Sequence, residues 1–304
     1  MSYRADTVVV LGLGLIGGSL ARALRQSGFC RRIVGYGHRE PSLRRGLELG
    51  VIDEFTLDLD EAIAAADILV LCTPTLVAAA TLEQILLCLA GRADGPVITD
   101  AASVKGNLLS AARGACGGDF PPRLVLAHPI AGSERSGVEA SDASLYVNHR
   151  VILTPVAGND PAALQLVRDM WRSTGAEVVE MTVEEHDAVL AATSHLPHLL
   201  AYALVDALAQ SPASDDIFRF AAGGFRDFIR IASSDPVMWR DIAIANRDAL
   251  LAATDTFSGH LAQLRRAVAE GDGDTLLETF RRAKRARDQF AAMLKQRGQT
   301  EPGA

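Results

Sequence analysis

A histidine stands where a buried strand is expected to end. Residues 127–134 read AHPIAGSE and follow the apolar run Leu124-Val125-Leu126. Pro129 disfavours a helix here, and the small residues after it form a flexible turn. A buried strand end rarely needs an imidazole unless something binds against it, and an imidazole with its ordinary pKa of about 6.5 exchanges a proton near neutral pH. His128 is therefore a candidate acid or base.

A second pair of histidines lies in the stretch ATSHLPH. His195 and His198 are three residues apart, which places them on one face of a helix. No Cys, Asp or Glu stands nearby at ligand spacing, so the pair is a weak metal signal and no metal site is expected. Contact with a substrate is the favoured interpretation, and hydrogen-bonded core histidines are the alternative.

The stretch GGFRDFIRIASSDPVMW places an arginine among apolar neighbours. A guanidinium in such a setting needs an anion. The anion is either Asp227, which lies three residues before Arg230, or a carboxylate on a bound substrate. Both interpretations are open at this point.

A glycine-rich turn near the N-terminus has the pattern of a dinucleotide site. Gly12, Gly14 and Gly17 form a GxGxxG array, with Leu15 and Ile16 inside it, after a strand-like run and before an amphipathic helix. Gly12 permits the tight turn, Gly14 lets the backbone approach a pyrophosphate, and Gly17 lets helix and strand pack closely. The start of the helix adds partial positive charge. We expect these five residues to bind the cofactor.

The choice between NAD and NADP depends on the next strand. A site that selects NAD usually ends this strand on an acid, whereas here Ile33-Val34-Gly35-Tyr36 is followed by Gly37. His38 or Arg39 could pair with a 2′-phosphate, which favours tolerance of NADP. Alternatively, Glu40 or a backbone group serves the ribose hydroxyl of NAD.

The elements that must position these groups alternate along the first part of the chain. From Thr7 to about Met181, β-rich runs such as TVVVLGLG, DILVLCTP and HRVILTP alternate with helical stretches. This alternation predicts an α/β domain with a mostly parallel sheet of Rossmann type. Ligands bind such sheets at the carboxyl ends of the strands. We therefore expect a cofactor and substrate crevice at the residues that follow these runs: Thr73, Pro74, Ser103 and His128.

After Thr182 the β-rich runs stop, and Ala- and Leu-rich stretches with helical spacing follow. We predict a dinucleotide-binding domain at residues 1–181 and an all-helical substrate and dimerisation domain at residues 182–304. The apolar stretch Ala201–Val205 could be buried in its own bundle or against a second copy of the chain. The second option predicts a homodimer through the helical domain.

Composition narrows the class of protein. The 304 residues are 49% hydrophobic and 22% charged, with a formal charge of −7, which suits a globular protein and makes nucleic acid a poor partner. No apolar run is expected to reach the roughly 20 residues of a membrane span. Residues 1–6 lack the features of a signal peptide, so a cytoplasmic location is expected. The four cysteines show no CxxC spacing and are expected to be reduced.

Five motifs in order, GLGLIGGS, DAASVK, HPIAGSE, SHLPH and RIASSDPVMW, make the chain resemble the prephenate dehydrogenase family. This family includes the cyclohexadienyl and arogenate dehydrogenases of tyrosine biosynthesis. The resemblance implies a nucleotide-binding domain followed by a helical dimerisation domain. It also implies oxidative decarboxylation of prephenate, or L-arogenate, to 4-hydroxyphenylpyruvate, or L-tyrosine, with hydride transfer to NAD(P).

The resemblance also implies roles for single residues. His128 matches the catalytic histidine, which draws the proton from the ring hydroxyl. Ser103 matches a serine that orients this histidine and touches the nicotinamide. Arg230 matches an arginine that holds a substrate carboxylate. The other matched positions belong to the substrate pocket, its polar lip or its entrance: Ser133, Glu134, Ser194, His195, His198, Asp227 and Trp239. Gly37 departs from the family, which usually has an acid there, and this puts the choice of cofactor in doubt.

Two other functions are compatible with the general layout. A β-hydroxyacid dehydrogenase would carry a lysine early in its helical domain, but the chain has only Lys105, Lys284 and Lys295. A dinucleotide-binding sensor without turnover would be expected to lose the histidine or the arginine, whereas His128 and Arg230 are both present. An active dehydrogenase is therefore the favoured interpretation.

Overall fold

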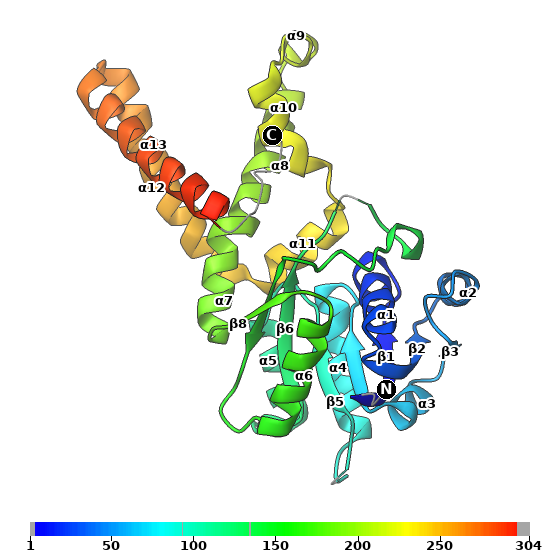
Figure 1. Cartoon of the computed structure of the whole chain (residues 1–304). Helices are drawn as coiled ribbons and strands as arrows, with labels where there is room; N and C mark the ends of the chain where they lie inside the picture. The colour runs from blue at the N-terminus through cyan, green and yellow to red at the C-terminus, as the bar shows by residue number, and fades with distance from the viewer. Residues whose placement is uncertain (1–3, 93, 134, 297–304) are drawn as a thin grey trace. The chain divides into compact units, whose positions relative to one another are not determined.

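The first part of the chain is built on a single sheet (Figure 1). A computed structural model describes residues 4–92, 94–133 and 135–296. Its eight strands lie in the order β3-β2-β1-β4-β5-β6-β7-β8. The strands are β1 (Ala5–Leu11), β2 (Cys30–Tyr36), β3 (Glu54–Thr56), β4 (Ile68–Leu71), β5 (Val97–Asp100), β6 (Leu124–Ile130), β7 (Arg150–Thr154) and β8 (Glu177–Glu180). Neighbouring strands are parallel except β6 and β7.

The predicted mostly parallel sheet is therefore confirmed, and it contains one strand that no β-rich run of the sequence predicted. The additional strand, β3, has three residues and pairs only with β2 at the edge of the sheet. Its sequence, EFT, is too short to show any apolar alternation. It forms because the paired end of β2 offers its backbone groups, which is a tertiary contact.

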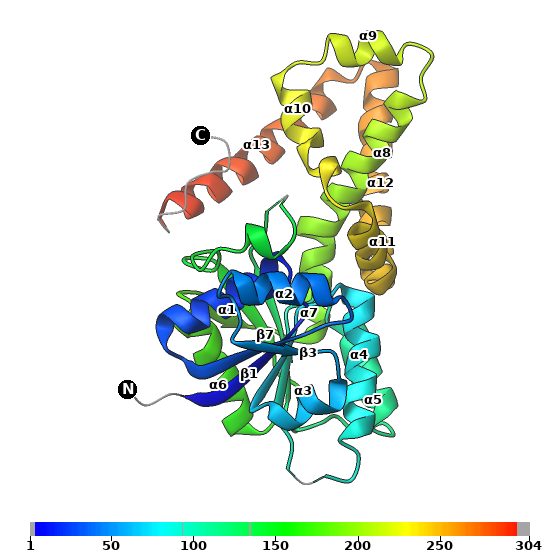
Figure 2. The same cartoon turned by 90° about the vertical axis from the view of Figure 1, so that its right-hand side faces the viewer.

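Helices cover both faces of the sheet, as Figure 2 shows. One face carries α1 (Leu15–Ser27), α2 (Glu40–Glu48) and α6 (Pro161–Ser173), and the other carries α3 (Leu59–Ala65), α4 (Thr75–Cys88) and α5 (Gly106–Ala115). In β1, Val8 and Val10 pack on the first face and Val9 and Leu11 on the second. A strand buried on both faces must be apolar throughout, which explains the unbroken run TVVVL.

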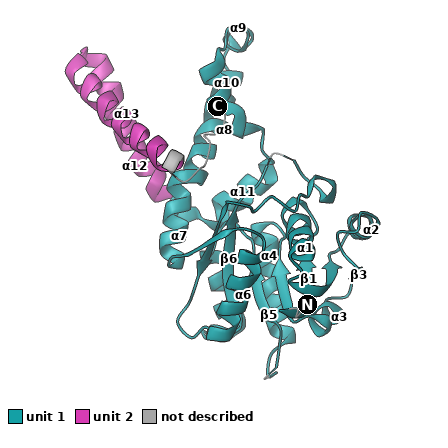
Figure 3. Ribbon diagram, viewed as in Figure 1, with its two compact units in different colours: residues 1–250 teal, residues 251–304 magenta. Residues whose placement is uncertain are grey.

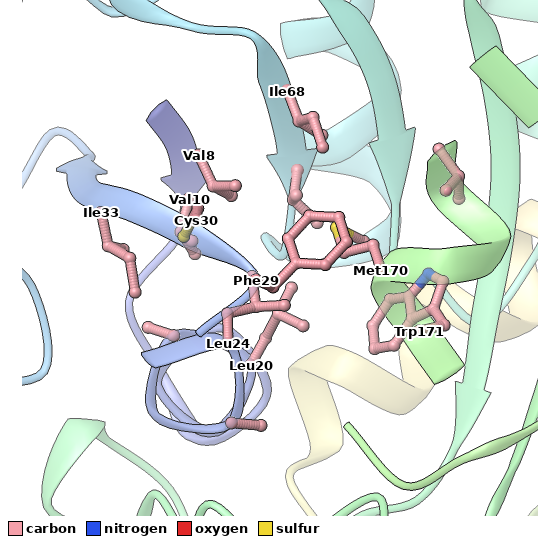
Figure 4. Packing of buried hydrophobic residues seen from close by; sticks show 14 of the residues in the cluster. Val8, Val10, Leu20, Leu24, Phe29, Cys30, Ile33, Ile68, Met170 and Trp171 are labelled. Carbon is pink, nitrogen blue, oxygen red and sulfur yellow. The ribbon is translucent and has the colours of Figure 1, made fainter. Parts of the chain in front are cut away.

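The core on the first face is closed by an aromatic side chain of α6. Met170 and Trp171 pack towards Leu20, Leu24 and Phe29, as Figure 4 shows. Trp171 is fully buried, so it fixes α6 and α1 over the same part of the sheet. This packing holds α1, whose first turn borders the glycine-rich turn.

The part of the chain after Thr182 is helical, as expected. Its elements are α7 (Val183–Leu190), the π turn η2 (Ala191–His195), α8 (Leu196–Ala209), α9 (Ser214–Arg219), α10 (Gly223–Ile229), the 3-10 turn η3 (Arg230–Ser233), α11 (Pro236–Ala245), α12 (Arg247–Glu270) and α13 (Gly273–Gln296). The described chain forms two compact units, residues 1–250 and residues 251–304 (Figure 3).

The expectation that no apolar stretch reaches the length of a membrane span is wrong for one helix. The continuous helix Val183–Ala209 is long and apolar enough to cross a membrane, by length and composition alone. A single such helix is weak evidence for a membrane, because a packed helix of a globular protein passes the same test. Only 22% of its most apolar window is buried in the described chain, so most of that apolar surface has no cover within one chain.

Candidate active site

The predicted cofactor residues meet at one edge of the sheet. Strand β1 lies between β2 and β4, so the chain reverses its direction of progress across the sheet at β1. Such a switch point is where open α/β sheets bind ligands. Gly12 follows β1 with a φ of 96°, and a Cβ there would lie 2.9 Å from Cγ2 of Thr73, which follows β4. Pro74 then caps α4.

The segment after β6 is tied to the first turns of α1. The Tyr146 hydroxyl donates to the Ile16 carbonyl at 2.6 Å. The Asp142 amide donates to the Ser19 hydroxyl at 2.9 Å, and Nε of Arg22 donates to the Ser141 hydroxyl at 2.8 Å. The chain that leaves His128 therefore returns to the helix that begins at the glycine-rich turn.

His128 lies inside a strand and not at its end. β6 continues to Ile130, so the expectation that the strand stops near Leu126 is wrong. Its parallel pairing with β5 covers only Leu124 and Val125, but its antiparallel pairing with β7 continues past His128. His128 is 9% exposed.

A buried ion pair between Lys105 and Asp100 holds the backbone of β6 where its pairing with β5 has ended. Nζ of Lys105 bonds to the Asp100 carboxylate and donates to the Ala127 carbonyl at 2.6 Å. The other Asp100 oxygen accepts from the Ala127 amide at 2.9 Å. Both backbone groups of the residue before His128 are thus held by two fully buried side chains.

A hydrogen-bonded chain fixes the protonation of His128. Nδ1 of His128 lies 2.8 Å from Nε2 of His186, and Nδ1 of His186 lies 2.7 Å from a carboxylate oxygen of Asp187. A carboxylate only accepts, so His186 donates to Asp187 and accepts from His128. Nε2 of His128 then carries no proton, and it has no hydrogen-bond partner among the described residues. It is a base with a free lone pair.

The Asp187 carboxylate is held at the start of α5. It accepts from the Lys105 amide at 2.9 Å and from the Gly106 amide at 2.8 Å. Burial alone would raise the pKa of Asp187, but the hydrogen bonds from His186 and these two amides outweigh it and keep that pKa below its usual value. Asp187 therefore stays ionised at neutral pH.

The two imidazoles of this hydrogen-bonded chain, His128 and His186, stay neutral at the same pH. Burial lowers the pKa of His128 well below 6.5, and His186, Lys105 and His195 lower it further. Burial also lowers the pKa of His186, although the bond to Asp187 opposes the shift. The ordinary pKa expected from the sequence is therefore replaced by a depressed one, which preserves the free base.

The buried histidines should make folding stability depend on pH. A folded-state pKa below that of the unfolded chain means that the unfolded chain takes up protons first as the pH falls. Stability is fully present above pH 6.5. As the pH falls below 6.5, each buried histidine lowers the free energy of unfolding by about 1.4 kcal/mol per pH unit, down to its own folded-state pKa. For His195 this pKa is about 4. Urea unfolding at pH 7.5 and pH 5.5 checks this.

The matched control for the pH effect is His260→Gln, because His260 is exposed. This variant should show the same loss of stability as the parent chain between pH 7.5 and pH 5.5. Equal unfolding free energies for the parent at both pH values would contradict the prediction.

The structure brings the other two histidines together against one tryptophan. The His198 ring stacks on Trp239 with centroids 3.5 Å apart, and the His195 ring meets the same indole edge-on at 6.1 Å. Both histidines are also hydrogen-bonded, His198 to the Ser194 carbonyl at 2.9 Å and His195 to the Asn246 side chain at 3.0 Å. Burial lowers the pKa of both.

The remaining predicted residues are placed less closely. Ser103 is half-buried in the loop between β5 and α5, but the partner that holds His128 is His186. Arg230 and Asp227 are exposed, and no ion pair joins them in the described structure. Arg230 nevertheless lowers the pKa of His198 by its charge, so the two lie near each other.

The last predicted residues are Ser133 and Glu134 of the polar pocket lip, and the two residues expected near the adenosine end of the cofactor. Ser133 is exposed and its hydroxyl accepts from the Arg135 amide at 3.2 Å. Glu134 lies outside the described residues. His38 and Arg39 are exposed after β2, where His38 meets Tyr36 edge-on. Among the described residues, no three His, Cys, Asp or Glu side chains gather as a metal site would require.

The sequence interpretation missed His186, Asp187 and Asn246. A signal for the first two exists, because the capping box of Thr182 and Glu185 fixes where α7 begins and puts a His-Asp pair in its second turn. Their contact with His128 spans 58 residues of chain and could not be read from spacing. Asn246 carries no local signal.

Comparison with known proteins decides the family. Residues 20–180 match the model of the prephenate dehydrogenase nucleotide-binding domain, and residues 182–282 match the model of the prephenate dehydrogenase dimerization domain. The chain belongs to the prephenate dehydrogenase family. A cyclohexadienyl dehydrogenase of Zymomonas mobilis is 36% identical over 92% of this chain and 94% of its own length. A prephenate dehydrogenase of Bacillus subtilis is 36% identical over 95% of this chain and 77% of its own.

Solved structures of this family have the same fold. Prephenate dehydrogenase from A. aeolicus, in complex with hydroxyphenyl propionate and NAD+, superposes with a TM-score of 0.86 at 37% identity, covering 95% of this chain and 100% of that one. Synechocystis arogenate dehydrogenase superposes with a TM-score of 0.77 at 29% identity, covering 93% and 99%. The prephenate dehydrogenase fold is thus shared over nearly the whole chain.

Proposed function

We propose that this chain catalyses the oxidative decarboxylation of prephenate or L-arogenate with hydride transfer to NAD(P), a step of tyrosine biosynthesis. The observation that carries the proposal is the hydrogen-bonded chain Asp187-His186-His128, which leaves one imidazole nitrogen as a free base. An oxidation that removes hydride from a carbinol carbon needs such a base for the hydroxyl proton. The chain is an NAD(P)-dependent dehydrogenase of its family.

The residues at the glycine-rich turn fit a dinucleotide. A Cβ on Gly14 would meet nothing within 4 Å, so the protein leaves open space there. Gly14 is the N-cap of α1, has no side-chain cap bond, and is followed by a first turn without acidic residues. The first amides of α1 are therefore available to a pyrophosphate. The bound dinucleotide supplies the hydride acceptor.

His128 moves the proton of the reaction. Its Nε2 accepts the hydroxyl proton as the C–O bond of the substrate gains double-bond character and hydride leaves the same carbon. Loss of the ring carboxylate as carbon dioxide returns its bonding pair to the ring, which becomes aromatic. The new phenol oxygen then takes the proton back, so no net proton is released. The neutral His186 and ionised Asp187 keep the other ring proton of His128 on Nδ1, so Nε2 is free to accept at the start of each turnover.

The other site residues bind and orient the substrate in this proposal. Arg230 holds a substrate carboxylate through a bidentate pair, since no carboxylate of the described residues forms an ion pair with it. Ser103 contacts the nicotinamide. The histidines and polar groups around Trp239 line the pocket and its entrance: Ser133, Glu134, Ser194, His195, His198 and Asp227.

NAD is the proposed cofactor, with NADP tolerated. Strand β2 ends at Tyr36, and Gly37 stands where an acid that repels a 2′-phosphate usually follows this strand. Arg39 is exposed at the start of α2, from where it could reach such a phosphate. The complex from A. aeolicus holds NAD+.

Initial rates of nicotinamide reduction test the function. Purified chain is assayed with prephenate or L-arogenate and with NAD or NADP, in all four combinations. Turnover in any combination supports the dehydrogenase, and the pattern of rates identifies the preferred substrate and cofactor. A folded protein that binds dinucleotide but is silent in all four would favour the sensor.

Two glycine variants separate cofactor binding from folding. Gly17→Ala is expected to destabilise the fold, because its Cβ would lie 2.2 Å from the Gly12 carbonyl oxygen. Gly14→Ala is expected to keep the melting temperature of the parent and to weaken NAD+ binding at least tenfold, because only the pyrophosphate would meet the methyl group. Thermal melts and NAD+ titration check both, and unchanged NAD+ affinity of Gly14→Ala would refute this placement of the pyrophosphate.

The proposed assembly is a cytoplasmic homodimer formed by the helical part, residues 182–304, with residues 1–181 binding the dinucleotide. Support comes from the match to the dimerization domain and from the largely uncovered apolar helix Val183–Ala209. A second copy that covered this face would stabilise the dimer by about 25 cal/mol for each Å² of apolar surface buried. The negative net charge argues against nucleic acid as a partner. Light scattering of the purified chain measures the mass of the particle and so tests the dimer.

A further inference from the structure

A buried asparagine at the end of α11 joins two parts of the candidate site. Asn246 is 5% exposed. Its side-chain nitrogen lies 2.9 Å from the Asp187 carbonyl oxygen and 3.0 Å from Nδ1 of His195. These contacts connect the end of α11 to α7 and to the π turn η2. Neither contact belongs to the base chain that ends at His128.

The orientation of this amide follows from its partners. A backbone carbonyl can only accept, so the group that faces Asp187 must be the NH₂ and not the oxygen of Asn246. One hydrogen of the NH₂ goes to Asp187 and the other points to His195. Nδ1 of His195 must therefore accept, and the ring proton must sit on Nε2.

His195 is then a neutral hydrogen-bond donor. Burial lowers its pKa to about 4, with His186 and His198 adding to the shift and Asp187 opposing it. Nε2 of His195 has no hydrogen-bond partner among the described residues, while the edge-on contact with Trp239 fixes the ring. The titratable groups that act on it lie on neighbouring elements: Asp187 and His186 on α7, and His198 on α8.

We propose that Asn246 is a positioning residue that fixes His195 as an uncharged Nε2–H donor to an oxygen of the substrate, a carboxylate or keto oxygen. The proposal rests on the dehydrogenase function and names which atom of the site receives that oxygen. An uncharged donor binds an oxygen without requiring the site to bury a cation at His195, which is 3% exposed. It rejects a group that can only donate, such as an ammonium.

Nitrogen-15 NMR of the histidine rings in the unmodified protein tests the tautomer directly, with His195→Gln used to assign the signal. We expect the proton on Nε2, a bare Nδ1, and no titration of this ring above pH 5. Asn246→Asp places a carboxylate beside Nδ1, and we expect the pKa of His195 to rise by more than one pH unit. A proton on Nδ1 in the parent protein would overturn the proposal. This readout needs no turnover, so it is independent of the proposed reaction.

Steady-state kinetics then tests the role towards substrate. In His195→Gln the amide NH₂ can stand at the place of Nε2, whereas in His195→Asn it stands at the place of Nδ1. We expect KM for the preferred substrate to rise about 10- to 100-fold in His195→Asn, the loss typical of a hydrogen bond to a charged group, and at least threefold less in His195→Gln. kcat should change less than KM in both.

A double-variant cycle connects Asn246 to that donor. Asn246→Ala is expected to raise KM about fivefold in the parent and less than twofold in the His195→Gln background, where no tautomer has to be fixed. A purely structural role for Asn246 would give the same factor in both backgrounds. Equal KM values for His195→Gln and His195→Asn would also overturn the proposal.

Discussion

Asp187→Asn is expected to lower kcat by about 10³- to 10⁴-fold while the chain remains folded and binds NAD+. An amide nitrogen facing Nδ1 of His186 would donate, which moves the proton of His186 to Nε2. His186 would then donate to His128, and Nε2 of His128 would carry a proton in place of its lone pair. A comparable change behind the catalytic histidine of a serine protease costs about 10⁴ in kcat.

The matched control for this change is Glu184→Gln, which makes the same chemical substitution on the exposed side of α7. Its kcat should stay within twofold of the parent. Because Asp187 also accepts two amides at the start of α5, melting temperatures must be compared before rates. A folded Asp187→Asn protein with nearly normal kcat would show that the base does not depend on this carboxylate.

His128→Asn is expected to lower kcat by about 10³-fold or more, with the affinity for NAD+ unchanged. The asparagine nitrogen can still donate to His186 in place of Nδ1, so the polar contact survives. Nothing remains at the position of Nε2 to accept the hydroxyl proton, and general-base catalysis contributes about 10²- to 10⁴-fold. Stopped-flow reduction of the nicotinamide with saturating substrate measures the chemical step.

The pH profile provides an independent check on the same base. In the parent, the acid limb of kcat/KM should lie below pH 6.5, because burial depresses the pKa of His128. The residual activity of His128→Asn should lack this limb. Equal chemical rates for variant and parent would remove His128 from the mechanism.

Local patterns predicted the sheet and the cofactor edge because each depends on neighbours in sequence. The array Gly12, Gly14 and Gly17 predicts the cofactor-binding turn, and the apolar run before it predicts strand β1. His128 could be singled out because an imidazole in an apolar run is locally conspicuous. The strand around it was cut short because its continuation to Ile130 depends on β7, which lies later in the chain.

The groups that give His128 its chemistry could not be predicted in this way. His186 and Asn246 act through contacts that span 58 and 51 residues of chain. The depressed pKa of His128 arises from burial, which a sequence does not display. For Arg230 the sequence left two anions open, Asp227 and a substrate carboxylate. The described chain holds no ion pair between Arg230 and Asp227.

The π turn at Ala191–His195 sets the angular phase of everything after it. An α-helix advances about 100° per residue, and a π turn accommodates one residue more than a regular turn. If the same residues were wound as a regular α-helix, with none removed, every side chain of α8 would be rotated by about 100° relative to α7. His198 would leave Trp239, and a different face of α8 would take the place of its present apolar one. One inserted residue thus sets both the pocket and the outer surface of the same helix.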